Sequence, residues 1–106
     1  MSLDTTLNLF RAIGEETRLR IMILLLAGEL TVSELTQILG QSQPRVSRHL
    51  KILADAGLVE RYREGAWVFY RAAEDAGDGT VAHAVLSALH GFSGADDRVV
   101  ARDRER

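Results

Sequence analysis

Residues 42–56, with the sequence SQPRVSRHLKILADA, constrain the fold of this chain more than any other segment. Successive residues of an α-helix lie about 100° apart, so Val46, Leu50 and Leu53 share one narrow face. The opposite face is basic and rich in hydroxyl groups toward its N-terminal end, and it contains Pro44, Arg45, Ser47, Arg48, Lys51 and Asp55. The segment is therefore predicted to be an amphipathic helix. Alone, this pattern is more typical of a solvated surface helix than of a nucleic-acid-binding one.

The ends of this helix are also marked. Ser42 is expected to cap the N-terminus, because its hydroxyl can accept from a free amide of the first turn. Pro44 lies in that turn, where a missing N–H costs least. Gly57 follows the helix and is expected to form a left-handed C-terminal cap.

Two helices are predicted near the N-terminus. The first covers residues 3–13 and carries Leu3, Leu7 and Phe10 along one side. The second covers about residues 16–27 and is apolar on all sides after its first turn. We therefore expect the second helix to be buried between other elements.

A third helix is predicted directly before the segment described first. Thr31 and Glu34 have the spacing of a capping box at its start, and Gly40 ends it. Only Gln41 and Ser42 separate it from the following helix. Two short helices joined by a tight turn, the second with a basic outer face, form a helix-turn-helix pattern.

After Gly57 the periodicity changes from helical to strand-like. Residues 58–63 and 66–71 are rich in Val and aromatic residues and lie on either side of Glu64-Gly65, which predicts a β-hairpin. The aromatic residues of the second strand are expected to form its packed side rather than to stack on bases, and they are Trp67, Phe69 and Tyr70. The predicted fold is mainly α with a small β-hairpin, a winged helix-turn-helix, and this combination predicts DNA binding.

The C-terminal third contains a last long helix, residues 80–92. Few other elements remain to cover its apolar side, so we expect a subunit interface there. That side contains Val81, Val85, Leu86, Leu89 and Phe92. We divide the chain into residues 1–92, a domain for DNA binding and dimerisation, and residues 93–106, a linker with the start of a further helix that we expect to be truncated.

Composition narrows the function classes. The 106 residues suffice for one domain, and the chain has no cysteine, which excludes disulfides and thiolate sites. We expect a cytoplasmic location and no membrane association, since no signal peptide is visible and the longest apolar run, 21–27, is short. Six Lys or Arg residues and three acids between 41 and 71 give +3, whereas the net charge of the whole chain is −2. One basic surface on an acidic body can attract a polyanion.

No enzyme and no cofactor is predicted. The sequence shows no constellation of nucleophile, base and orienting group. His83 and His90 are separated by about 10 Å along a helix, too far for one zinc ion with bonds of about 2 Å. His49 lies at the edge of an apolar face and is expected to be packed or hydrogen-bonded. We therefore predict no metal site.

Four motifs resemble ArsR/SmtB-type bacterial repressors. They are Ile13-Gly-Glu-Glu-Thr-Arg-Leu-Arg-Ile21, Leu30-Thr-Val-Ser-Glu-Leu35, Ser42-Gln-Pro-Arg-Val-Ser-Arg-His-Leu-Lys51, and Ala56-Gly-Leu-Val59 with Arg63-Glu-Gly65. The resemblance runs from about residue 7 to residue 71 in the expected order. It implies a homodimeric winged helix-turn-helix repressor whose first and last helices form the dimer interface. It also implies that an inducer releases the repressor from its operator.

The chain departs from the metal sensors of this family. Arsenic and lead sensors carry cysteines at the start of the third helix, where this chain has Thr31-Val32-Ser33. Zinc sensors carry Asp-x-His and His-x-x-Glu groups on the last helix, and neither pattern occurs here. The resemblance therefore leaves the effector unknown.

Residues 97–106 are similar to the junction that precedes an S-adenosylmethionine-dependent methyltransferase domain in longer proteins. An alternative function follows, in which this winged helix is an interaction or regulatory module of a methyltransferase protein and does not bind DNA itself.

For DNA, we expect the helix at 42–56 to enter the major groove with its N-terminal end leading. Arginine can form two hydrogen bonds to guanine there, and glutamine pairs with adenine, which suggests Arg45, Arg48 and Gln43. Contacts that position the helix without selecting sequence are expected from Ser42, Pro44, Ser47 and Lys51. A dimer would then require an inverted-repeat operator in double-stranded DNA.

Two flanking regions complete the predicted DNA surface. Thr31 and Ser33 begin the third helix and could donate to a phosphate, although Thr31 is more simply explained as the helix cap. Arg61 and Arg63 of the hairpin are expected near phosphates or a minor groove. Glu64 at the tip would repel phosphate unless it orders one of those arginines.

Overall fold

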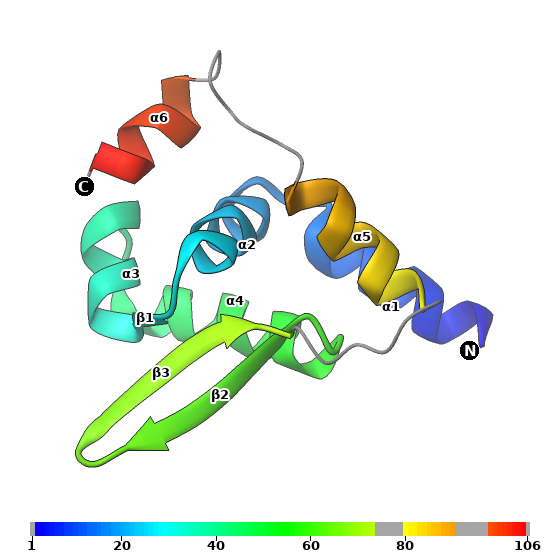
Figure 1. Ribbon diagram of the computed structural model, residues 1–106, viewed down its shortest axis with the longest axis horizontal. Helices are drawn as coiled ribbons and strands as arrows, with labels where there is room; N and C mark the ends of the chain where they lie inside the picture. Colours follow the sequence, from blue (N-terminus) through cyan, green and yellow to red (C-terminus); the bar gives the residue numbers. More distant parts are fainter. Residues whose placement is uncertain (1, 74–79, 91–97, 106) are drawn as a thin grey trace.

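Six helices and three strands make up the residues that the computed structural model describes, 2–73, 80–90 and 98–105 (Figure 1). In chain order they are α1 (Leu3–Ile13), α2 (Glu16–Ala27), β1 (Leu30–Thr31), α3 (Val32–Leu39), α4 (Gln43–Asp55), β2 (Val59–Glu64), β3 (Trp67–Ala72), α5 (Val81–His90) and α6 (Arg98–Glu105). The first four helices have the predicted bounds to within a residue. In this described part, no helix is both long enough and apolar enough to cross a membrane.

The buried helix α2 organises the packing. Its apolar residues from Ile21 to Leu25 are all at most 7% exposed, which confirms the predicted burial. Helices α1, α4, α5 and α6 and strand β3 all contact it. The largest fully buried side chains outside α2 come mainly from α3 and α4, and they include Leu35, Val46, Leu50 and Leu53.

Glycines and side-chain caps set the ends of the short helices. Thr31 and Glu34 form both hydrogen bonds of the predicted capping box. Gly40 ends α3 in the left-handed conformation with φ 66°, a conformation that glycine adopts without steric cost. The expected cap at Ser42 is wrong, because its hydroxyl makes no cap hydrogen bond. Pro44 occupies the second helical position and has no N–H, which removes one of the two amides such a hydroxyl can reach.

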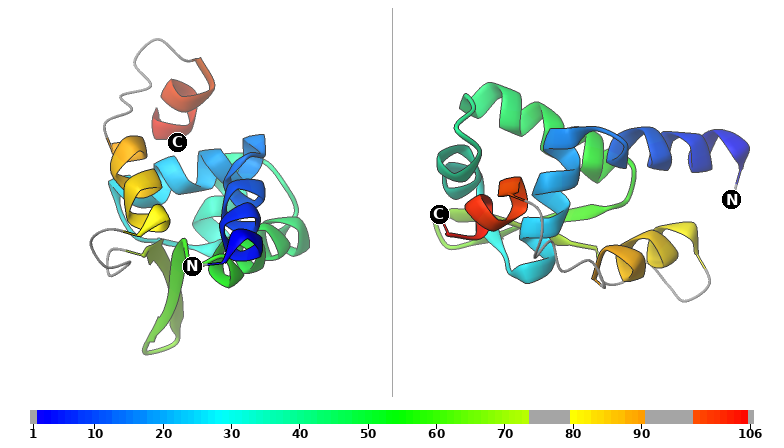
Figure 2. Two further views of the ribbon diagram at one scale, coloured as in Figure 1. Left: turned by 90° about the vertical axis from the view of Figure 1, so that its right-hand side faces the viewer. Right: turned by 90° about the horizontal axis from the view of Figure 1, so that it is seen from above.

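The three strands form an antiparallel sheet in the order β1-β3-β2. Glu64 pairs with Trp67, so the hairpin turns at Gly65 and Ala66, and each strand begins and ends one residue later than predicted. Gly65 has φ 63° while Ala66 does not have positive φ, as in a type II′ turn. The hairpin projects from the helical body, as the left view of Figure 2 shows.

The two faces of the hairpin differ, which corrects one prediction. Strand side chains alternate between faces, so Trp67 and Phe69 cannot share a side with Tyr70. Tyr70 is half-buried against the core, whereas Phe69 stacks on Tyr62 of β2 with ring centroids 5.6 Å apart. Trp67 is 65% exposed, so its assignment to a packed side is wrong. The Tyr62 hydroxyl also donates to Glu29 and thereby ties the hairpin to the body.

The last two helices pack against α2. Ala82 and Leu86 of α5 are buried in the core, and the predicted end of this helix at Phe92 lies outside the described residues. Helix α6 was expected only as the start of a further element. Instead it docks on α2, with Asp103 at 2% exposure accepting two hydrogen bonds of 2.8 Å from the Arg20 guanidinium.

Candidate nucleic-acid interface

Helix α4 presents the predicted reading surface to solvent. Its apolar back, formed by Val46, Leu50 and Leu53, is completely buried. The residues predicted to contact DNA from this helix and its cap are all exposed, namely Ser42, Gln43, Pro44, Arg45, Ser47, Arg48 and Lys51. The burial of one face therefore fixes which side chains the helix offers to a ligand.

The structure separates free cations from paired ones in this region. Lys51 pairs with Asp55 at 2.9 Å, and Arg71 pairs with Glu60 at 3.0 Å. Arg71 also lies over the Tyr62 ring, 4.8 Å from its centroid. The four remaining cations make no ion pair within the described part of the chain, and they are Arg45, Arg48, Arg61 and Arg63. Within residues 41–71, the positive charge available to a polyanion thus lies on α4 and the hairpin.

Arg61 and Arg63 lie on one face of the hairpin. Arg61 is opposite Tyr70 and Arg63 is opposite Val68, and both arginines are exposed. Glu64 follows Arg63 directly and therefore points to the other face. Among the described residues Glu64 forms no ion pair with either arginine, so it does not order them.

The start of α3 contributes one free hydroxyl rather than two. Thr31 is 9% exposed, and its hydroxyl donates to Glu34 Oε1 at 3.1 Å and accepts from the Glu34 amide at 3.2 Å. Thr31 therefore acts as the helix cap and has no spare donor for a phosphate. Ser33 is exposed on α3, the helix that contacts α4.

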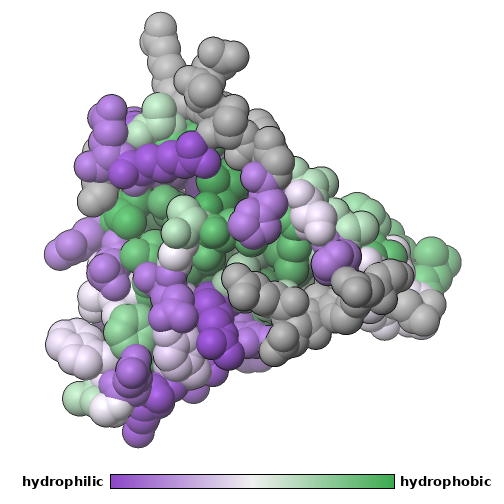
Figure 3. Space-filling view, in the orientation of Figure 1, coloured by the Kyte–Doolittle hydropathy of each residue, from purple (hydrophilic) through white to green (hydrophobic). Residues whose placement is uncertain are grey.

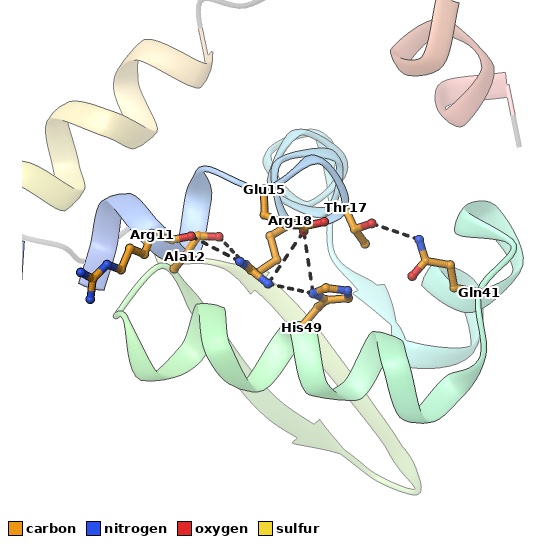
Figure 4. Close-up of polar contacts among 7 residues, drawn as sticks. All are labelled: Arg11, Ala12, Glu15, Thr17, Arg18, Gln41 and His49. Atoms are coloured by element: carbon orange, nitrogen blue, oxygen red, sulfur yellow. Dashed lines mark hydrogen bonds and ion pairs between the residues drawn. The ribbon is translucent and has the colours of Figure 1, made fainter. Parts of the chain in front are cut away.

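Arg18 connects α4 to the corner between α1 and α2 (Figure 4). Its Nε donates to the carbonyl oxygen of Ala12 at 2.6 Å, and its Nη2 donates to that of Arg11 at 3.3 Å. Its Nη1 lies 3.1 Å from His49 Nδ1. The prediction that His49 is hydrogen-bonded is confirmed. No spacing rule reveals this contact, because 31 residues separate Arg18 from His49 in the chain.

The charges around this corner shift two pKa values. Burial lowers the pKa of His49, the Glu15 carboxylate opposes that effect, and the charges of Arg18, Arg45 and Arg48 add to it. Burial by itself raises the pKa of Glu15. Hydrogen bonds from backbone N–H groups at the start of α2, together with the charges of His49 and Arg18, outweigh burial and lower that pKa overall. His49 is therefore neutral at pH 7, and its Nδ1 can accept from Arg18.

A second anchor holds the turn between α3 and α4. Gln41 Nε2 donates to the Thr17 hydroxyl of α2 at 3.0 Å, and Thr17 is buried. From the sequence alone, Gln41 is expected only to separate the third and fourth helices. Its contact with Thr17 fixes the turn that precedes α4.

An apolar surface lies away from the cationic one. Leu3, Leu7 and Phe10 of α1 are 77%, 41% and 51% exposed, and Figure 3 shows apolar side chains at the end of the molecule where α1 lies. The residues of α5 that were predicted to face a partner differ in burial. Val81, Val85 and Leu89 are half-buried, and Leu86 is buried in the core. Phe92 lies outside the described residues.

The described residues contain no group of three potential metal ligands.

Known proteins resemble this chain in sequence. Residues 15–61 match the family described as "Bacterial regulatory protein, arsR family". The "Arsenical resistance operon repressor" of Escherichia coli (strain K12) is 46% identical over 72 residues, which cover 67% of this chain and 62% of the repressor. The chain likewise spans 49% to 65% of the length of three further curated relatives.

Solved structures resemble it in fold. HlyU from Vibrio cholerae N16961 superposes with a TM-score of 0.68 at 35% identity, covering 85% of this chain and 95% of HlyU. The homodimeric winged helix-turn-helix DNA-binding domain of Mb0332 from Mycobacterium bovis superposes with a TM-score of 0.69 at 30% identity, covering 82% and 76%. The chain thus has a winged helix-turn-helix fold, and it belongs to the arsR family of bacterial regulatory proteins.

Proposed function

We propose that this protein is a homodimeric, sequence-specific DNA-binding repressor that reads the major groove with α4. The observation that carries this proposal is a set of four guanidinium groups on α4 and the hairpin that form no ion pair with any residue the structure describes, namely those of Arg45, Arg48, Arg61 and Arg63. Two of them, Arg45 and Arg48, lie on α4, and the opposite face of this helix is completely buried. A helix fits the major groove, and phosphates attract unpaired cations.

Within this surface, we assign base reading to the first half of α4. Arg45 and Arg48 are exposed and unpaired, so either can form two hydrogen bonds to guanine, and Gln43 can pair with adenine. Ser42, Ser47 and Ser33 offer hydroxyl groups to phosphates. Lys51 must give up Asp55 to reach a phosphate, so we assign it a smaller role.

Arg61 and Arg63 are assigned to the DNA backbone or a minor groove. They share one hairpin face, and neither pairs with a carboxylate of the residues that the structure places. Their contribution should therefore follow ionic strength rather than base sequence.

We place the dimer interface on the exposed apolar side of α1 together with α5. Leu3, Leu7 and Phe10 leave an apolar stripe on the surface, and stripes of this kind mark interaction sites in soluble proteins. The Mb0332 domain, which has the same fold, is described as homodimeric. We assign dimerisation and DNA binding to residues 1–92, and two copies would bind half-sites about 34 Å apart.

We propose that the residues of this chain do not bind their effector through thiolates. The Escherichia coli relative is named for arsenical resistance. This chain has no cysteine, so it cannot bind arsenic through thiolates of its own. We propose that these residues do not sense a metal.

The test is selection of duplex DNA by the purified protein from a random library, followed by affinity measurements at several salt concentrations. We expect enrichment of an inverted repeat, and an affinity for it that falls steeply as salt rises, because phosphate contacts release counterions. Arg48→Ala should reduce the preference for the selected duplex over a scrambled one. Lys51→Ala is the matched control and should reduce it less. Absence of any enriched sequence would refute the proposal and favour the protein-interaction alternative.

A further inference from the structure

The guanidinium of Arg18 joins three helices at one corner. It donates to two carbonyl oxygens at the C-terminal end of α1, those of Arg11 and Ala12, and its Nη1 lies 3.8 Å from the Glu15 carboxylate at the start of α2. The same Nη1 contacts His49 in the middle of α4. The side chains of Arg18 and His49 are each only 15% exposed. Figure 4 shows the guanidinium lying between α1 and the imidazole.

We propose that Arg18 is a positioning residue, which sets the orientation of α4 relative to α1 through His49. This inference rests on the proposed function, in which α1 belongs to the dimer interface and α4 reads DNA. In such a dimer, the direction of α4 relative to α1 determines the separation of the two reading helices. Arg18 then controls which half-site spacing the dimer accepts.

The chemistry of the contact suits this role. The C-terminal end of a helix is the negative end of its dipole, so the carbonyl oxygens of α1 hold a guanidinium firmly. A guanidinium is planar and donates in fixed directions, whereas apolar packing has no preferred direction. Val46, Leu50 and Leu53 attach α4 by apolar packing. Among the described residues, His49 supplies the polar side-chain contacts from α4 to α1 or α2.

Protonation of His49 provides a way to break the contact without a mutation. Neutral Nδ1 accepts a hydrogen bond, whereas protonated Nδ1 carries a hydrogen and cannot accept from Arg18. The charged groups that face the imidazole are Glu15 and Arg18 of the α2 end and Arg45 and Arg48 of α4. Helix α1 faces this corner with backbone carbonyl oxygens that bind Arg18. Burial and the three arginines keep the imidazole neutral near pH 7, so acidification should release it.

The readout is spacing discrimination, the affinity for the selected inverted repeat divided by that for the same half-sites separated by one additional base pair. A uniform gain or loss of charge changes both affinities equally and cancels in this ratio. His49→Leu removes the acceptor. His49→Asn is the matched control, because its Oδ1 is attached like Nδ1 and accepts without titrating. Arg18→Lys keeps the positive charge but loses the planar group of donors.

We expect the discrimination of the wild type to fall about tenfold between pH 7.5 and pH 5, the size of effect that follows from losing a hydrogen bond to a charged group. His49→Leu and Arg18→Lys should show the low ratio at both pH values, and His49→Asn should show the high ratio at both. Thermal unfolding verifies that each variant is folded, and the imidazole ¹⁵N shifts of His49 in the wild type verify that it is neutral at pH 7.5 and protonated at pH 5.

Two outcomes would overturn the inference separately from the proposed function. One is a folded His49→Leu variant that binds its operator with undiminished spacing discrimination. The other is a pH dependence in His49→Asn equal to that of the wild type. Failure to select any duplex would overturn the proposed function and this inference with it, and that outcome is recognisable before any spacing is compared.

Discussion

The docking of α6 depends on one buried ion pair, and Asp103→Asn tests it. Each carboxylate oxygen of Asp103 lies 2.8 Å from a different nitrogen of Arg20, and Asp103 is 2% exposed. Asparagine has nearly the same volume as aspartate. In either orientation of its amide, however, an NH₂ group replaces one of the two carboxylate oxygens and faces a guanidinium donor. The hydrogen bond to Asp103 raises the pKa of Arg20. A guanidinium also stays charged at neutral pH without that bond, so the substitution leaves a buried positive charge without its carboxylate.

Breaking a buried pair by removing one partner costs about 3–5 kcal/mol. Here α6 can detach instead and return Arg20 to water, which limits the decrease in the free energy of unfolding. Among the α6 side chains that the structure describes, the other buried one is Val100, whose burial contributes about 1.5–3 kcal/mol. We therefore expect the free energy of unfolding to fall by about 3 kcal/mol or less, with α6 detached.

Amide hydrogen exchange, with one control variant, separates detachment of α6 from general destabilisation of the fold. Amide hydrogen exchange should show loss of protection throughout α6, while protection at Ile21–Leu25 of α2 follows global stability. Glu105→Gln makes the same charge change at an exposed site on the same helix and should leave α6 protected. Unchanged α6 protection in Asp103→Asn, with a stability loss below about 0.5 kcal/mol, would refute the reasoning.

Three further predictions follow from the burial and charge patterns. Leu7→Glu should give monomers in analytical ultracentrifugation and should reduce operator affinity. The control Asn8→Glu, one position along α1, should leave a dimer. A Leu7→Glu variant that remains a dimer would contradict the proposed interface. Arg61→Ala should reduce the slope of log affinity against log salt by about 1 without changing sequence preference; an altered preference would assign it to base reading. Leu50→Ala should destabilise the fold by about 2–5 kcal/mol in urea unfolding, because this side chain is completely buried; a loss below about 1 kcal/mol would mean that α4 is not anchored as described.

Local signals in the sequence predict the helices well. The capping box at Thr31, the left-handed glycines and the apolar period of α4 are each decided within a few residues of the chain. The same holds for the exposed face of α4, since burial of Val46 and Leu50 determines what points outward. These features also carried the resemblance to the arsR family that the comparisons confirmed.

Contacts between distant segments could not be predicted in this way. The pair of Arg20 and Asp103 joins residues 83 apart, and no local pattern distinguishes it from two solvated charges. Strand β1 contains only two residues, too few to show an alternation. Trp67 was misassigned because aromatic content was considered without the alternation of strand faces. The missing cap at Ser42 depends on the position of Pro44, one residue beyond the start of the helix.

The central claim is that α4 reads bases in the major groove with its exposed arginines, and an atom-specific exchange at Arg48 tests it most directly. Each guanine of the selected operator is replaced in turn by 7-deazaguanine, which lacks the N7 acceptor that arginine uses. Affinities are measured at one salt concentration for the wild type and for Arg48→Ala. We expect one replacement to cost the wild type about 1–3 kcal/mol and to cost Arg48→Ala almost nothing. Equal losses in both proteins at every guanine would contradict the claim.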